Sequence, residues 1–206
     1  MAYPPTTGLI LAGGQSRRLG VDKTRLTLHR GEPLLAQVGR VLAPLCAELI
    51  VMANWPRSEI LPEATWLSDI HPGMGSLGGI YTGVLRAAHQ HCLVVAGDMP
   101  FLSTALLRYM LEQPRDYDVL IPRFDGFFEP LHAIYGKGCL EPMLALIERQ
   151  ERKILDFFPK VRVRYLEAST AAQIDPQRRS FFNVNTIEQL AEAWVMMLQE
   201  DASARS

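Results

Sequence analysis

The sequence predicts a doubly wound α/β fold with a mostly parallel central sheet. Two observations lead to this prediction. Short apolar runs alternate with helical patterns along the first half of the chain, and these runs are apolar throughout rather than at every second residue. Continuous apolar runs are typical of strands covered on both faces, as in parallel sheets. Alternation with helices supplies the crossovers that such a sheet needs.

Five strands are expected in the first half of the chain. They cover residues 8–12, 49–53, 65–67, 92–96 and 119–121. Amphipathic or helical patterns over about 33–45 and 103–113 lie between them, and a glycine-rich helix entry lies at 73–80. This order of elements is the one that a doubly wound sheet requires.

The second half is less regular. We expect strands at 131–135 and 161–165, the latter alternating and half-exposed, with a helix over about 138–149 between them. The sequence contains no repeat, low-complexity tract or linker that would justify a domain boundary. A single domain is therefore expected over residues 1–206, with a core of about 7–195 and frayed ends.

The last helix has a clear start signal. Thr186 and Gln189 have the spacing of a capping box, in which each side chain bonds a backbone N–H of the first turn. The apolar residues that follow at helical spacing are Leu190, Ala193, Trp194 and Met197. We expect these four to face the core.

Composition and charge exclude several classes of protein. The 206 residues are 48% apolar and 21% charged, which excludes wholesale disorder, and their net charge of −1 comes with no basic run. The broad basic surface of a nucleic-acid-binding protein is therefore missing. No apolar stretch approaches the roughly 20 residues that span a bilayer, and the first 16 residues lack the basic start of a secretory signal.

The three cysteines are far apart and form no CxxC pair, so neither a disulfide framework nor a zinc site is indicated. They are Cys46, Cys92 and Cys139. Together with the missing signal and membrane segment, this pattern predicts a cytoplasmic protein that binds neither nucleic acid nor a membrane.

The strongest local signal is the loop at 11–23, which reads LAGGQSRRLGVDK and follows the first strand. A loop in this position lies at the carboxyl edge of the sheet, where ligands bind. Gly13 and Gly14 let the backbone approach an anion, and Arg18 and Lys23 supply charge suited to phosphate. The loop matches neither Walker A nor GxGxxG. The alternative is a glycine-rich turn with solvated arginines.

Three further features follow later in the chain. Asp98, at the end of the fourth strand, can hold Mg²⁺ together with substrate phosphates, or it can be a turn aspartate. The glycines of 73–80 permit a flat base or ribose to lie against the backbone, although close helix packing explains them equally well. Asn183 and Asn185 can present amides on the same side of a strand end, or act as turn formers.

In this order and spacing, the motifs resemble the molybdenum cofactor guanylyltransferase family over about residues 7–195. The matching segments are the loop 11–23, Gly75-x-Leu77-x-Gly79-Ile80, Asp98-Met99-Pro100-Phe101, Glu129-Pro130-Leu131 and Phe182-Asn183-Val184-Asn185-Thr186. The first loop alone is shared with sugar-phosphate and cytidylyl transferases, whereas the combination is specific. Ser76 and Gly97 depart from the family's usual proline and cysteine, and neither is expected to supply a needed side chain.

The resemblance implies a Rossmann-like nucleotidyltransferase fold and a reaction. GMP passes from GTP to the terminal phosphate of molybdopterin that carries molybdenum, and pyrophosphate is released. The residues implied for GTP binding are Leu11, Ala12, Gly13, Lys23, Asp69, Gly75, Gly79 and Asp98. Asp98 is also the implied Mg²⁺ ligand, and Asn54 stays unassigned. Separately, because strand ends of a doubly wound sheet converge on one edge, we expect Asn183 and Asn185 on the acceptor side.

The chemistry of the acceptor agrees with this implication. A phosphate monoester has a second pKa near about 6, so it is largely dianionic at pH 7 and needs no strong general base. Mg²⁺ on Asp98, with Arg18 and Lys23, can relieve its repulsion with the triphosphate. These three residues are the catalytic candidates, and the expected site is electrostatic rather than acid–base.

Other functions stay open at this point. One is a cytidylyltransferase acting on molybdopterin or another small phosphate, although by resemblance Gly13-Gly14 favours GTP. A sugar-1-phosphate nucleotidyltransferase fits less well, because Lys23 follows the glycines too closely. A third is a non-catalytic nucleotide-binding chaperone of the cofactor, which the combination of Asp98, Lys23 and Arg18 disfavours. Transient contacts with proteins of cofactor synthesis or molybdoenzyme maturation are a further expectation.

Overall fold

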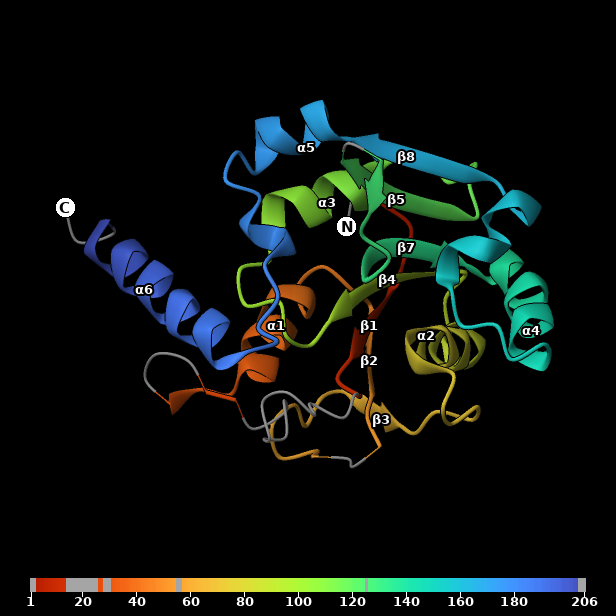
Figure 1. Cartoon of the computed structure of the whole chain (residues 1–206), viewed down its shortest axis with the longest axis horizontal. Coiled ribbons are helices and arrows are strands. Elements are labelled where there is room, and N and C mark those ends of the chain that lie inside the picture. Colours follow the sequence, from red (N-terminus) through yellow and green to blue (C-terminus); the bar gives the residue numbers. More distant parts are fainter. Residues whose placement is uncertain (1–2, 14–25, 28–30, 55–56, 125, 204–206) are drawn as a thin grey trace.

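A computed structural model describes residues 3–13, 26–27, 31–54, 57–124 and 126–203 (Figure 1). Within these ranges an eight-stranded sheet has the order β3-β2-β1-β4-β7-β5-β6, and β8 also pairs with β5. The strands are β1 Thr7–Leu11, β2 Glu48–Met52, β3 Thr65–Leu67, β4 His91–Ala96, β5 Val119–Phe124, β6 Phe127–Phe128, β7 His132–Gly136 and β8 Val163–Glu167. All of the strands expected from the sequence are present.

Most neighbouring strands are parallel. β1 pairs in parallel with both β2 and β4, β2 with β3, and β5 with β8. The strand expected at 131–135 is β7, and it runs antiparallel to both of its neighbours, β4 and β5. The prediction of a mostly parallel sheet is thus confirmed, with two reversed strands: β7, which separates β4 from β5, and β6, which pairs antiparallel with β5.

Six helices complete the described part of the chain. They are α1 Leu34–Leu42, α2 Gly75–Arg86, α3 Thr104–Glu112, α4 Leu140–Glu148, α5 Ala168–Ile174 and α6 Ile187–Ser203. Short 3₁₀ segments also occur, at η3 Lys137–Cys139, η4 Ile154–Lys160 and η5 Arg179–Phe181. Over the described ranges, no helix has both the length and the apolar character that crossing a membrane demands.

Helices cover both faces of the sheet, so the doubly wound prediction is confirmed. Neighbouring residues of β1 show why its apolar run is continuous. Ile10 packs into a core with Leu35 of α1 and residues of α3, whereas Leu9 packs into a second core with Ile80 of α2 and residues of α4. Because both faces are buried, a strand that alternated apolar and polar residues would leave one core unfilled.

Two element boundaries differ from the sequence expectation. The helix expected over 138–149 opens with η3, so α4 begins only at Leu140. The last strand covers Val163–Glu167 rather than 161–165, and Arg162, just before it, is bonded to Asp118. The Asp118 carboxylate accepts hydrogen bonds from the backbone N–H and the guanidinium of Arg162, at 3.0 to 3.1 Å.

The start of α6 follows the capping prediction in part. Thr186 Oγ1 accepts a hydrogen bond from the Gln189 N–H at 3.2 Å, as a capping box requires. The reciprocal bond is shifted by one residue, because Gln189 Oε1 accepts from the N–H of Asn185 at 2.8 Å. Gln189 therefore holds the backbone of Asn185 rather than that of the cap residue.

The apolar face of α6 is narrower than the sequence suggested. Ala193 is buried, and Leu190 and Met197 pack partly against Leu26, Leu34 and Val184. Trp194 is 49% exposed, so its expected place in the core is wrong. Among the described residues, those packed beneath α6 form this small cluster, which does not include Trp194, and the helix extends away from the sheet (Figure 1). The Trp194 indole N–H donates to the carbonyl of Thr27 at 3.4 Å.

Candidate active site

The predicted site residues that the structure describes gather where β1 and β4 end. The strand order reverses beside β1, because the chain passes first to β2 on one side and later to β4 on the other. Such a switch point leaves a crevice at the carboxyl edge of a parallel sheet. Two cavities occupy this edge, one on each side of the end of β1.

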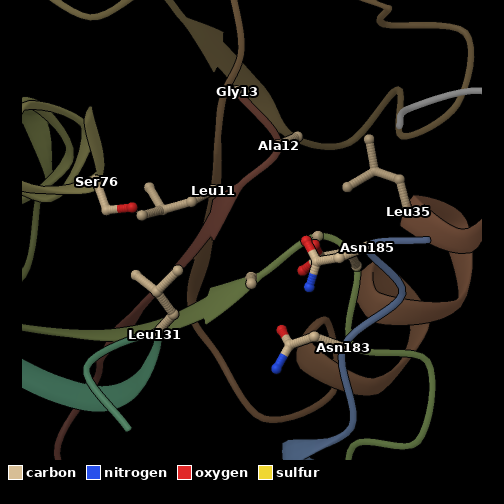
Figure 2. Close-up of a pocket in the computed structure, with 11 residues that line it drawn as sticks. Leu11, Ala12, Gly13, Leu35, Ser76, Leu131, Asn183 and Asn185 are labelled. Carbon is tan, nitrogen blue, oxygen red and sulfur yellow. The ribbon is translucent and has the colours of Figure 1, made fainter. Parts of the chain in front are cut away.

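The first cavity has a volume of about 270 Å³, and we call it the Asp98 cavity (Figure 2). It is lined by Leu11, Ala12, Gly13, Leu35, Ser76, Ala96, Gly97, Asp98, Leu131, Asn183 and Asn185. The second has a volume of about 470 Å³, and we call it the Asp69 cavity. It is lined by Leu11, Gly13, Met52, Ala53, Asn54, Asp69, Pro72, Gly73, Gly75, Ser76 and Gly79.

The backbone after β1 is tied to both neighbouring strands. The Ala12 N–H donates to the carbonyl of Met52 at 2.9 Å, and the Gly97 N–H donates to the carbonyl of Leu11 at 2.9 Å. The segment therefore enters the site in a fixed position. Leu11 and Gly13 line both cavities, and Ala12 lines the Asp98 cavity. The sequence placed these three residues at the site, and they do lie there.

Asp98 follows β4 by two residues and is only 8% exposed. The turn that carries it is tight, since a Cβ on Gly97 would lie 3.3 Å from Leu35 and 3.4 Å from Ala12. The carbonyl of Asp98 accepts a hydrogen bond from the Val184 N–H at 2.9 Å. That bond brings a segment from far along the chain against the end of β4.

Asn183 and Asn185 both line the Asp98 cavity, on the same side of their segment (Figure 2). The expectation that they stand at a strand end is wrong, because residues 182–185 belong to no strand. The side chains still alternate along this segment, because Val184, between the two asparagines, is buried with Leu34 beneath α6. Asn183 Nδ2 also donates to the carbonyl of Phe181 at 2.9 Å, so this asparagine shapes the turn as well.

Asp69 lines the other cavity and also organises the entry to α2. One carboxylate oxygen, Oδ1, accepts from the His71 N–H at 2.8 Å and from the Thr82 hydroxyl at 2.9 Å. The other, Oδ2, lies against the helix backbone, where a Cβ on Gly78 would approach it to 2.5 Å. Because a Cβ at that distance would force the carboxylate to shift, the glycine at 78 leaves room for Asp69 in its present position.

The glycines of 73–80 make a turn, pack closely on the sheet and line a cavity. Gly73 and Gly75 have φ angles of +90° and +63°, which other residues adopt only with strain, so they make the turn into α2. Gly79 packs closely on β1, since a Cβ there would lie 3.3 Å from Leu11. All three also line the Asp69 cavity.

Several lining residues escaped the sequence analysis. Ser76 and Gly97 were set aside as supplying nothing, yet both line the Asp98 cavity, and Ser76 lines the second cavity too. The position of Ser76 between Gly75 and Gly79 was the available signal. Asn54, two residues beyond β2, lines the Asp69 cavity. Leu131 belongs to the Glu129-Pro130-Leu131 segment of the resemblance but was given no role. Leu35 had no signal, because only the packing of α1 brings it to this edge.

The described part of the site offers little acid–base chemistry. Among the residues that the structure covers, no group of three His, Cys, Asp or Glu side chains could hold a metal by itself. His132, next to Leu131, is fully buried, and burial lowers its pKa to about 4, which leaves it neutral near pH 7. Burial raises the pKa of Glu129. Arg18 and Lys23, the predicted phosphate-binding cations, lie outside the described residues.

Comparison with known proteins agrees with this geometry. The family model for the MobA-like NTP transferase domain matches residues 8–165. The chain is 39% identical to the "Probable molybdenum cofactor guanylyltransferase" of Pelotomaculum thermopropionicum, over 92% of each chain. The chain belongs to the molybdenum cofactor guanylyltransferase family. It is accordingly a nucleotidyltransferase, from a family that generally uses a divalent metal.

Two further relatives fit the same family. The chain is 32% identical to the molybdenum cofactor guanylyltransferase of Desulfosudis oleivorans, over 91% of this chain and 93% of that protein. The crystal structure of molybdopterin-guanine dinucleotide biosynthesis protein A from Archaeoglobus fulgidus superposes with a TM-score of 0.83, at 29% identity, over 94% of this chain and 100% of that one. The nucleotidyltransferase fold expected from the sequence is confirmed.

Proposed function

We propose that this protein transfers GMP from GTP to molybdenum-carrying molybdopterin, forming the guanine dinucleotide form of the cofactor and releasing pyrophosphate. The observation that carries the proposal is the pair of adjoining cavities at the end of β1, which can hold two substrates side by side. Membership of the family points to GTP and molybdopterin as those substrates. An oxygen of the acceptor phosphate attacks the α-phosphorus of GTP, and the bond to the β-phosphate breaks.

The nucleotide is assigned to the Asp69 cavity, whose volume of about 470 Å³ lies within the usual range for a small-molecule site. Gly75 and Gly79 offer a wall without side chains, against which a flat base can lie. Leu11 and Gly13 line this cavity at the end of β1, and Ala12, between them, lines the neighbouring Asp98 cavity. Asp69 has its Oδ1 engaged by two donors, so its Oδ2 is the atom assigned to the nucleotide.

The acceptor is assigned to the Asp98 cavity. Asn183 and Asn185 supply amide donors and acceptors there without adding charge, which suits a pterin or a phosphate in a site already crowded with anions. Gln189 holds the backbone of Asn185, and the bond from Val184 to Asp98 holds the segment between the two amides. The amides are therefore pre-positioned, which lowers the entropic cost of binding.

Asp98 is the proposed Mg²⁺ ligand. Its carboxylate is largely withdrawn from water and lines the acceptor cavity beside the end of β1, and Mg²⁺ is typically held by one or two carboxylates together with substrate phosphates and water. The donor set therefore fits this metal. When bound, Mg²⁺ would reduce the repulsion between acceptor and triphosphate. Arg18 and Lys23, in the loop after β1, are proposed to bind the triphosphate and share in this neutralisation.

Two expectations about the cellular setting are proposed with this function. Action in the cytoplasm is proposed because the nucleotide is available there. A reactive cofactor must also be received from one protein and passed to another. Transient contacts with proteins of cofactor synthesis or molybdoenzyme maturation are proposed on that ground.

The decisive experiment measures pyrophosphate release with molybdenum-loaded molybdopterin, Mg²⁺ and either GTP or CTP. We expect turnover with GTP and at most a small fraction of it with CTP. Comparable turnover with CTP would make the protein a cytidylyltransferase. Nucleotide binding without acceptor-dependent pyrophosphate release would leave a non-catalytic chaperone of the cofactor.

The Lys23→Ala variant tests the role of the loop after β1. We expect GTP binding to weaken and the transfer rate to fall about 10²- to 10³-fold, because both the ground state and the transition state are anionic there. Unchanged GTP affinity and rate would return the loop to a glycine-rich turn with solvated cations.

A further inference from the structure

The two cavities meet along a short shared wall. Among the residues that the structure describes, Leu11, Gly13 and Ser76 line both of them. Leu11 carries an apolar side chain and Gly13 carries none, so Ser76 supplies the polar side chain of this described set. A group that moves from a ligand in one cavity to a ligand in the other must pass this wall.

The hydroxyl of Ser76 is available to a ligand. Ser76 is the second residue of α2 and is exposed at the cavity surface. Its Oγ points from α2 toward Leu11, across the boundary between the cavities (Figure 2). In the described part of the chain, this oxygen forms no hydrogen bond to another residue. Ser76 makes no other polar contact there.

The helix does not need this hydroxyl. The cap position of α2 is Met74, and no side chain caps the helix there. Gly75, with its φ of +63°, makes the turn into the helix. The helix start is therefore formed by backbone and glycine geometry, without a contribution from the Ser76 hydroxyl.

We propose that the Ser76 hydroxyl donates a hydrogen bond to a non-bridging phosphate oxygen at the junction and orients the α-phosphorus toward the acceptor. This inference rests on the proposed function. A hydroxyl donates a stronger hydrogen bond to an anionic oxygen than to a neutral oxygen. It also adds no charge beside Asp98. Ser76 keeps its proton throughout, while the acceptor oxygen forms the new P–O bond and pyrophosphate leaves with the electrons of the old one.

The position of Ser76 predicts an effect on turnover more than on nucleotide affinity. The nucleotide is held mainly by the walls of the Asp69 cavity, which the loss of one hydroxyl leaves intact. The orientation of the reacting phosphorus matters most when the bond is made, so interactions at the junction favour the transition state. One hydrogen bond to a charged group corresponds to roughly a ten- to one-hundredfold change in rate.

The test compares Ser76→Ala and Ser76→Thr with wild type, and uses Ser58→Ala as a matched control. Ser58 is an exposed serine outside both cavities. Acceptor-dependent pyrophosphate release gives kcat and KM, and GTP titration and thermal melting are measured on the same preparations. For Ser76→Ala we expect kcat to fall roughly ten- to one-hundredfold, with GTP affinity within about twofold of wild type and Tm unchanged. Ser76→Thr should recover most of the rate, and Ser58→Ala should match wild type.

Each failure has a distinct signature. Wild-type turnover in Ser76→Ala would overturn the role of Ser76 and leave the proposed function standing. So would a lowered rate accompanied by a lowered Tm and no recovery in Ser76→Thr, since that pattern describes a local packing defect. If wild type itself releases no pyrophosphate with GTP and the acceptor, the proposed function fails and the inference falls with it.

Discussion

In mild acid, the His132→Leu variant should lose much less stability than wild type does. His132 is 0% exposed, and its ring lies 4.7 Å from that of Phe181, measured between centroids. Neither ring nitrogen has a hydrogen-bond partner in the described structure. Burial lowers the pKa of His132 to about 4, although Asp175 and the backbone of Ser180 act in the opposite direction.

The size of the effect follows from the two pKa values. In the unfolded chain a histidine titrates near 6.5, so between that pH and about 4 the unfolded state binds a proton that the folded state does not. Stability therefore falls as the pH falls through this window. Each pKa unit corresponds to about 1.4 kcal/mol, so the loss reaches about 2 kcal/mol by roughly pH 5 and about 3 kcal/mol once both states are protonated.

Urea unfolding of wild type and His132→Leu at several pH values between 7 and about 4.5 measures this loss. The free energy of unfolding should decline more steeply in wild type, and the difference between the two proteins should grow by about 2 kcal/mol from pH 7 to about pH 5. His132→Gln separates titration from polarity, because it should flatten the profile while staying less stable than His132→Leu at pH 7. Parallel profiles for wild type and both variants would refute the assignment of a buried, neutral histidine.

Three further predictions concern the cavities. Asp98→Asn should lower the rate of pyrophosphate release about 10²- to 10³-fold and raise the Mg²⁺ concentration that the reaction needs, while Tm is retained. Normal activity at low Mg²⁺ would exclude Asp98 as the metal ligand. Asn185→Ala should depress transfer to molybdopterin with little effect on GTP affinity, and weakened GTP binding, or lost stability with normal turnover, would remove it from the acceptor side. Gly78→Ala would place a Cβ 2.5 Å from Asp69 Oδ2, so calorimetry should show weaker GTP binding. Gly83→Ala is the control, because its Cβ would lie 2.3 Å from Leu9 in the core and should mainly lower Tm. Equal GTP affinity in the two variants would show that Asp69 does not shape the nucleotide cavity.

Local sequence patterns were sufficient to predict the strands and helices that pack into the core. An apolar run such as 8–12 can be satisfied only if both of its faces are covered, and the two cores on either side of β1 show this directly. The same reasoning located the site in part. Residues directly after a buried parallel strand must emerge at the carboxyl edge, which is why Gly13 and Asp98 could be placed there from sequence.

Patterns that depend on a distant partner were less informative. Trp194 has helical spacing with Leu190 and Ala193, yet it is exposed, because periodicity does not report how wide a surface the rest of the chain offers. The strand at 131–135 was recognised, but its reversal between β4 and β5 was not, since an apolar run carries no information about its direction.

The chain's own residues thus determine the strands, the helices on both faces and the chemistry of the loop ends, because burial and backbone conformation are local requirements. The tertiary structure alone decides which loop ends meet. The Val184 N–H reaches the carbonyl of Asp98, which brings Asn183 and Asn185 beside a strand that ends much earlier in the sequence. Ser76 reaches both cavities because α2 packs beside Leu11 at their junction. Such contacts join segments that are far apart in the sequence, and spacing along the chain does not give their partners or their distances.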